Sequence, residues 1–145
     1  MIKPDGVQRG LVGKIIARFE EKGLKLEALK FLRPSECLLH QHYAEHQGKS
    51  FFEPLVKYIQ SGPVVPMVWQ GPDAVKIART LIGSTNPSQS PPGTIRGDMA
   101  VQTQKNLIHG SDSVTSAERE IDLWFDNKEL IGWDRDGDKW VLESA

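Results

Sequence analysis

Apolar positions along the chain follow helical spacing in some segments and strand-like spacing in others. After Gly10, the apolar residues of segment 11–19 recur every three or four positions, which predicts an amphipathic helix. Gly23 supplies the stop, because glycine enters the left-handed cap conformation without strain. Segment 24–32 then shows a mixed alternation of apolar and polar side chains. This pattern predicts a strand directly after the helix.

Four further helices are predicted from the same kind of spacing. Ser35 is the expected N-cap of the first, and segment 51–59 forms the second. Asp73 is the expected cap of the third, which runs to about residue 82. The last spans about 114–125, where apolar side chains again share one side.

Two short apolar runs complete the predicted elements. Segment 64–69 is β-branched at one end and carries Pro66, which indicates a strand with an irregularity. Segment 107–109 is the last predicted strand, and 83–97 is a long loop of a kind that is usually functional. The order of elements predicts one α+β domain over residues 1–145. We expect a ferredoxin-like sandwich, a four-stranded antiparallel sheet with helices packed on it.

Composition narrows the classes of partner. The chain is 39% apolar and 26% charged with a net charge of −1, which offers no strong nucleic-acid footprint. The lone cysteine, Cys37, excludes an internal disulfide and suits a reducing compartment. No apolar run approaches the roughly 20 residues that span a bilayer, so we expect no membrane partner. Without an apolar signal core at its start, the chain is expected in the cytoplasm, or in an organelle if a targeting segment was removed.

His109 is the histidine whose surroundings favour chemistry. It stands where an apolar run gives way to small polar residues just before a helix, a place suited to anions. Neutral imidazole keeps a lone pair near pH 7 and can attack phosphorus without a dedicated base. From position alone, however, a structural histidine is favoured over a catalytic one. The other histidines, His40, His42 and His46, do not share one helical face, and we interpret them as surface residues rather than metal ligands.

Three cationic residues stand in sequence contexts that differ from an ordinary exposed helix face: Lys3, Arg79 and Arg96. Phosphoryl transfer asks mainly for in-line positioning and for compensation of anionic oxygens, and guanidinium groups suit phosphate. Spacing does not show that these cations converge, so a solvated surface charge is the favoured interpretation of each one taken singly. The glycine-rich motifs of P-loop and dinucleotide-binding folds are absent from the sequence.

Five segments together resemble the nucleoside diphosphate kinase family, in the family's order and at its spacing. They are 3–10 (KPDGVQRG), 61–65 (SGPVV), 85–87 (TNP), 92–98 (PGTIRGD) and 106–113 (NLIHGSDS). The resemblance covers essentially the whole chain. It implies a ping-pong kinase of broad base specificity, in which a nucleoside triphosphate phosphorylates His109 and a nucleoside diphosphate then collects the γ-phosphoryl group.

The resemblance also implies which residues hold the nucleotide. Lys3 and Asn106 contact ribose hydroxyls, with Lys3 also near the transferred phosphate. Phe51 stacks on the base, and because a ring face recognises any base, purines and pyrimidines are accepted alike. The distal phosphates are held by three side chains: Arg79, Thr85 and Arg96.

Around the nucleophile, the resemblance implies three supporting residues. Glu120 orients the imidazole of His109 by hydrogen bonding, Ser111 supports the site, and Tyr43 lies at the phosphate end. Mg²⁺ arrives with the nucleotide and bridges its phosphates, so no protein-only metal site is expected.

The resemblance implies a homo-oligomer as well. Pro87 falls in the loop that the family uses at its subunit contact, and segment 140–143 resembles the tail of hexameric members, so we expect a hexamer rather than a tetramer or dimer. Two departures stand out. Only Met1 and Ile2 precede the first motif, so the first strand is expected to be truncated, and residues 104–105 replace the family's Gly-Arg pair.

Two other function classes compete with the enzyme. One is a regulatory or nucleic-acid-associated protein on the same fold that no longer turns over. The other is a ferredoxin-like ligand sensor in which His109 is a packing residue. Retention of the cations, Asn106 and His109 argues against the first of these, because a site without activity has no chemical reason to keep them all. Acid-labile phosphate on His109 would separate the enzyme from both.

Overall fold

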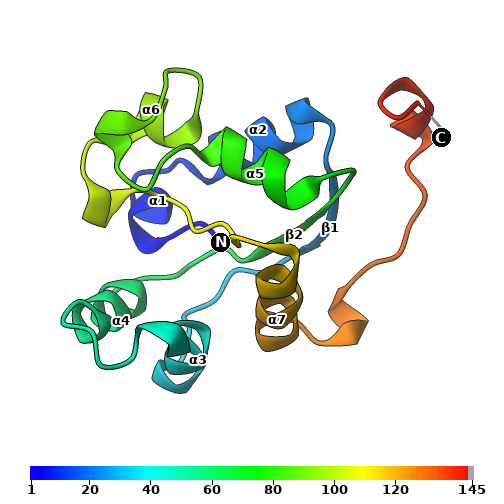
Figure 1. Ribbon diagram of the computed structural model, residues 1–145. Helices are drawn as coiled ribbons and strands as arrows, with labels where there is room; N and C mark the ends of the chain where they lie inside the picture. The colour runs from blue at the N-terminus through cyan, green and yellow to red at the C-terminus, as the bar shows by residue number, and fades with distance from the viewer. Residues whose placement is uncertain (144–145) are drawn as a thin grey trace.

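The computed structural model describes residues 1–143 (Figure 1). Two strands are formed, β1 (Lys25–Leu29) and β2 (Met67–Gln70). The helices are α1 (Pro4–Gln8), α2 (Val12–Lys22), α3 (Glu36–His42), α4 (Phe52–Gln60), α5 (Ala74–Ile82), α6 (Ile95–Met99) and α7 (Val114–Trp124). None of the helices in this part of the chain is long and apolar enough to cross a membrane.

The sheet is antiparallel, and most of its strands are short. β1 pairs with β2, and isolated bridges add Leu32 opposite Val64, Ile2 opposite Val65, and Ile2 opposite Ile108. Segments 25–32, 64–70, 1–3 and 107–109 therefore lie side by side in that order. The α+β fold with an antiparallel sheet is confirmed. Within residues 1–143, however, only two of the four expected strands form continuous ladders.

The missing ladders have local causes. Pro66 has no backbone N–H and separates the bridge at Val65 from β2. Leu107 has a φ of +73°, which takes the chain out of the extended conformation next to the bridge at Ile108. On the other side, the chain turns into α1 directly after Lys3.

The predicted helix ends are confirmed, but one expected side-chain cap does not form. The Ser35 hydroxyl accepts a hydrogen bond of 3.1 Å from the Leu38 N–H, and Gly23 caps α2 with a φ of +107°. Asp73 precedes α5 as expected, but its side chain makes no capping bond. It has a φ of +49°, rather than the extended backbone that normally aims a capping carboxylate at the first turn.

Two apolar clusters lie on opposite faces of the sheet. The first joins the sheet to α2, α5 and α6, and its buried members are Ile2, Ile15, Phe19, Leu24, Val65, Ile82, Ile95, Leu107 and Ile108. The second joins it to α3, α4 and α7, and its buried members are Ala28, Leu39, Tyr43, Phe52, Val56, Ile59, Val64, Trp124 and Phe125. The N-terminal residues enter the middle of the molecule between these helix layers (Figure 1).

Ile2 is a core residue whose truncation should cost substantial stability. Its side chain is fully buried, and its backbone bridges the two neighbouring segments of the sheet. We expect Ile2→Ala to lower the free energy of unfolding by about 2–5 kcal/mol, because it leaves a cavity in the core. Urea denaturation at fixed protein concentration measures this loss.

The matched control is Ile131→Ala, the same change at a side chain that is 55% exposed. It should shift stability by no more than about 0.5 kcal/mol. Equal losses in the two variants would contradict the central position assigned to Ile2.

Candidate active site

A cleft of about 700 Å³ opens between α4 on one side and the ends of α3, α5 and α7 with the loop at residues 103–106 on the other. Its size is typical of a small-molecule site. Every site residue expected from the sequence except Ser111 lines it, namely Lys3, Tyr43, Phe51, Arg79, Thr85, Arg96, Asn106, His109 and Glu120. The fold therefore brings together residues from the whole length of the chain.

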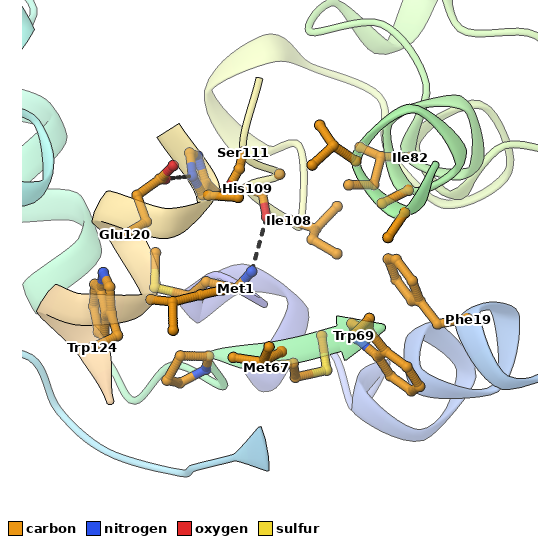
Figure 2. Close-up of a pocket in the computed structure, with 18 of the residues that line it drawn as sticks. Met1, Phe19, Met67, Trp69, Ile82, Ile108, His109, Ser111, Glu120 and Trp124 are labelled. Carbon is orange, nitrogen blue, oxygen red and sulfur yellow. Dashed lines mark hydrogen bonds and ion pairs between the residues drawn. The ribbon is translucent and has the colours of Figure 1, made fainter. Parts of the chain in front are cut away.

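The backbone of His109 is anchored to the start of the chain. Its N–H donates to the Met1 carbonyl, and the Met1 nitrogen donates to the His109 carbonyl, both at 2.8 Å. Figure 2 shows the second of these bonds as the dashed line below His109. This double link places the imidazole at the end of the sheet, where it faces α7.

A strained turn precedes the histidine. Leu107 is buried with a positive φ, a conformation that a branched residue rarely adopts. The Asp5 carboxylate accepts a 3.1 Å bond from the Leu107 N–H, and Arg96 donates to the carbonyls of Asn106 (3.2 Å) and Ile108 (2.6 Å). These bonds on both sides of Leu107 hold the turn in place.

Glu120 on α7 determines which nitrogen of His109 is free. One Glu120 oxygen contacts His109 Nε2 (Figure 2), and the carboxylate is buried. Burial alone would favour the neutral acid, but the hydrogen bond and charge of His109 outweigh it and lower the pKa of Glu120 to about 2. An ionised carboxylate can only accept hydrogen bonds, so Nε2 carries the ring proton and Nδ1 keeps the lone pair.

The imidazole itself is neutral near pH 7. Burial lowers the pKa of His109 below its ordinary value, against the opposing effect of its hydrogen bond to Glu120. A neutral ring with its lone pair on Nδ1 is a nucleophile that needs no separate base.

Cationic side chains and one side-chain amide lie near His109. Lys3 Nζ donates to the Asn106 side-chain oxygen at 2.8 Å, and the Asn106 amide donates to the Thr85 carbonyl at 2.9 Å. Burial and the nearby charge of Arg96 lower the pKa of Lys3 to about 8, so it is still mostly protonated at pH 7. Arg79 reaches the same end and donates to the Gly110 carbonyl at 3.1 Å.

The opposite end of the cleft is aromatic. Phe51, directly before α4, is 47% exposed, and its ring meets the His46 ring at 5.1 Å. Tyr43 belongs to the histidine end instead: it is buried, and its ring lies edge-on to His109 at 6.3 Å. Burial raises the pKa of Tyr43, so its hydroxyl stays protonated. The cleft thus offers an apolar ring face at one end and cations with a nucleophile at the other.

Comparisons with known proteins agree with this geometry. A family model described as nucleoside diphosphate kinase matches residues 1–130. A nucleoside diphosphate kinase of Drosophila melanogaster is 59% identical over 99% of this chain and 94% of its own length. The human nucleoside diphosphate kinase 3 is also 59% identical, over 98% of this chain and 84% of its own. The chain belongs to the nucleoside diphosphate kinase family.

Solved structures of the family have the same fold. The enzyme of Halobacterium salinarum, solved in complex with CDP, superposes with a TM-score of 0.95 at 54% identity, over 98% of this chain and 95% of that one. A family protein from Babesia bovis gives a TM-score of 0.95 at 50% identity, over 97% and 95%. As a nucleoside diphosphate kinase, the protein is an enzyme that transfers the terminal phosphoryl group of a nucleoside triphosphate to a nucleoside diphosphate.

Two expected site residues occupy positions that the sequence did not indicate. Ser111 lies outside the cleft, in a smaller cavity behind Glu120, where its hydroxyl favours the ionised form of that carboxylate. Arg96 is buried, and its third bond, to the Gly83 carbonyl at 3.1 Å, ties it to the long loop. Arg96 therefore holds the backbone in place through hydrogen bonds to carbonyl groups, and it also lines the cleft.

The interpretation of His42 as a surface residue is wrong. His42 is only 4% exposed, its ring lies 4.7 Å from the His109 ring, and its Nε2 lies 3.5 Å from a Glu120 oxygen. It sits three residues after the buried Leu39, on the same face of α3. The three-residue spacing from Leu39 is the sequence signal that places His42 on the buried face of α3.

Replacing the Glu120 charge should change the titration of His109. The carboxylate raises the pKa of His109 against the effect of burial, so Glu120→Gln should lower that pKa further below its ordinary value of 6.5. NMR titration of the ring nitrogens measures the shift. Glu118→Gln, at an exposed position on the same helix, is the control and should leave the titration in place. An unchanged His109 pKa in Glu120→Gln would contradict the assigned pairing.

Proposed function

We propose that His109 is the residue that carries the phosphoryl group, with Nδ1 as the attacking atom. The lone pair of Nδ1 forms the N–P bond while the bond between the γ-phosphorus and the bridging oxygen breaks, and the nucleoside diphosphate leaves with that electron pair. A second diphosphate then attacks the same phosphorus through its terminal oxygen and returns the electron pair to Nδ1. The observation that supports this assignment is the contact between His109 Nε2 and the buried Glu120 carboxylate.

Glu120 acts in this proposal by its fixed negative charge. When Nδ1 bonds to phosphorus, the imidazole becomes more positive while Nε2 keeps its proton. A carboxylate already aligned with that N–H stabilises the developing charge without reorganisation. The Ser111 hydroxyl stabilises the ionised Glu120 carboxylate, and the Tyr43 ring packs beside the imidazole of His109.

The cations are proposed to hold the phosphates. Lys3 lies beside Asn106, so one pair can contact the ribose hydroxyls and the transferred phosphate together. Arg79, Thr85 and Arg96 line the same end of the cleft and are assigned to the distal phosphates. Arg96 uses three of its nitrogens on carbonyls but has five N–H donors, so donors remain for an anion.

Phe51 is proposed to stack on the base. Its exposed ring offers a face rather than edge hydrogen bonds, and every base has a face to pair with it. This contact accounts for acceptance of purine and pyrimidine nucleotides alike.

Mg²⁺ is proposed to enter with the nucleotide. Among residues 1–143, the groups that could hold a metal are His42, His109 and Glu120, and separately Glu36, His40 and Glu53, which lie outside the cleft. The first set is rich in nitrogen, whereas Mg²⁺ prefers oxygen ligands. Mg²⁺ that arrives on the nucleotide's own phosphates would need no ligand from this chain. When bound, it would neutralise charge on the phosphate oxygens.

The assembly is proposed to be a homo-hexamer of single-domain subunits over residues 1–145, acting in the cytoplasm. Exposed apolar side chains support self-association, among them Val114 (64% exposed) and Trp140 (85% exposed). The loop at Pro87 is a proposed subunit contact. Residues 144 and 145, the last two of the proposed domain, lie outside the described residues.

Labelling with γ-phosphate-labelled ATP and Mg²⁺ tests the proposed nucleophile. We expect label to enter the wild-type protein, to survive alkali but not acid, and to leave as GTP when GDP is added. His109→Ala should take up no label, because it lacks the attacking nitrogen. His40→Ala, a histidine change outside the cleft, is the matched control and should label normally. Undiminished labelling of folded His109→Ala would contradict the proposal, and an unlabelled wild type would point to a binding protein.

A further inference from the structure

His42 is a buried titratable group that the proposed reaction does not yet use. It ends α3, and its side chain lies between Trp124 and Glu120 of α7. Arg119 donates to the carbonyls of Gln41 (3.1 Å) and His42 (3.2 Å), which fixes the end of α3 against α7. The ring position is therefore determined by the backbone as well as by packing.

Trp124 determines which nitrogen of His42 carries the proton. The indole N–H donates to His42 Nδ1 at 3.0 Å, and an indole nitrogen can only donate. Nδ1 is therefore the acceptor, and Nε2 carries the hydrogen of the neutral ring. Burial, followed by the charge of His109, lowers the pKa of His42 to about 3, so the ring stays neutral near pH 7.

This tautomer argues against a metal at the cluster of His42, His109 and Glu120. A metal ligand must offer a lone pair, but Nε2 of His42 offers a proton instead. The same atom makes no hydrogen bond with any described residue, and the polar group that faces it is the Glu120 oxygen at 3.5 Å. A buried N–H dipole aimed at a buried carboxylate is suited to holding that carboxylate in place.

We propose that His42 is a positioning residue, whose Nε2–H holds the Glu120 carboxylate in the orientation that binds His109 Nε2. The same Glu120 oxygen faces both histidines. Two N–H groups directed at one oxygen restrict the carboxylate more than either does alone. Because His42 is neutral, it restricts Glu120 without cancelling the negative charge that acts on His109.

This inference rests on His109 being the nucleophile and predicts an effect on chemistry rather than on binding. His42→Leu fills a similar volume without a donor and should lower the single-turnover rate of His109 phosphorylation roughly tenfold, because the Glu120 carboxylate then loses the polar N–H group that faces it. The dissociation constant for the nucleotide should stay unchanged. His42→Gln, whose amide can again donate toward Glu120, should recover most of the rate.

A double substitution tests whether His42 acts through Glu120. In a Glu120→Gln background, His42→Leu should produce little further loss of rate, because the carboxylate it holds is gone. Trp124→Phe leaves His42 in place but removes the bond that fixes its tautomer, and it should lower the rate in the same direction. This variant also serves if His42→Leu fails to fold.

Three results would overturn the inference while leaving wild-type labelling intact. They are a wild-type rate in folded His42→Leu or Trp124→Phe, a rate in His42→Gln as low as in His42→Leu, and a full additional loss in the Glu120→Gln background. Failure of the wild type itself to take up label would instead contradict the proposed role of His109. The two failures are therefore distinguishable.

Discussion

The buried carboxylate of Glu120 is the group on which the chemistry of the site depends. Removing a carboxylate from water is costly, and here the cost is offset by the contact with His109 Nε2, which keeps the carboxylate ionised. That charge fixes the tautomer of His109 and leaves Nδ1 free. The nucleophile is therefore prepared before any nucleotide binds, and no proton has to be removed when it attacks.

The fold positions Glu120 and His109 by bringing distant segments of the chain together at the end of a short sheet. The first residues of the chain lie between segments 64–65 and 107–109, so the carbonyl of Met1 anchors His109. The turn at Leu107 is strained, and Asp5 and Arg96 hold it with hydrogen bonds to the backbone on both sides. Arg96, which is expected to touch substrate, thus also maintains the backbone that presents the nucleophile.

Local patterns predicted much of the fold. Periodicity and caps placed α2, α3 and α4, because an amphipathic face and a cap at Ser35 are encoded within a few residues. The helix α1 was missed, since five residues containing proline and glycine show no period. The ladders at Ile2 and Ile108 are shorter than predicted because a helix start and a positive φ end them. Such limits depend on tertiary contacts that a short window does not contain.

Motif resemblance predicted the candidate site more fully than residue spacing could. Spacing alone favoured a structural role for His109. The spacing of His42 from Leu39 indicates burial, but its partner Trp124 lies about eighty residues away on α7, so no local pattern could place it beside Glu120. The most direct test of the account is NMR assignment of the phosphorylated nitrogen, by phosphorus–nitrogen coupling in the labelled protein. We expect phosphorus on Nδ1 of His109, with Nε2 still protonated and bonded to Glu120. Phosphorus on Nε2 would contradict it, because Glu120 occupies that position.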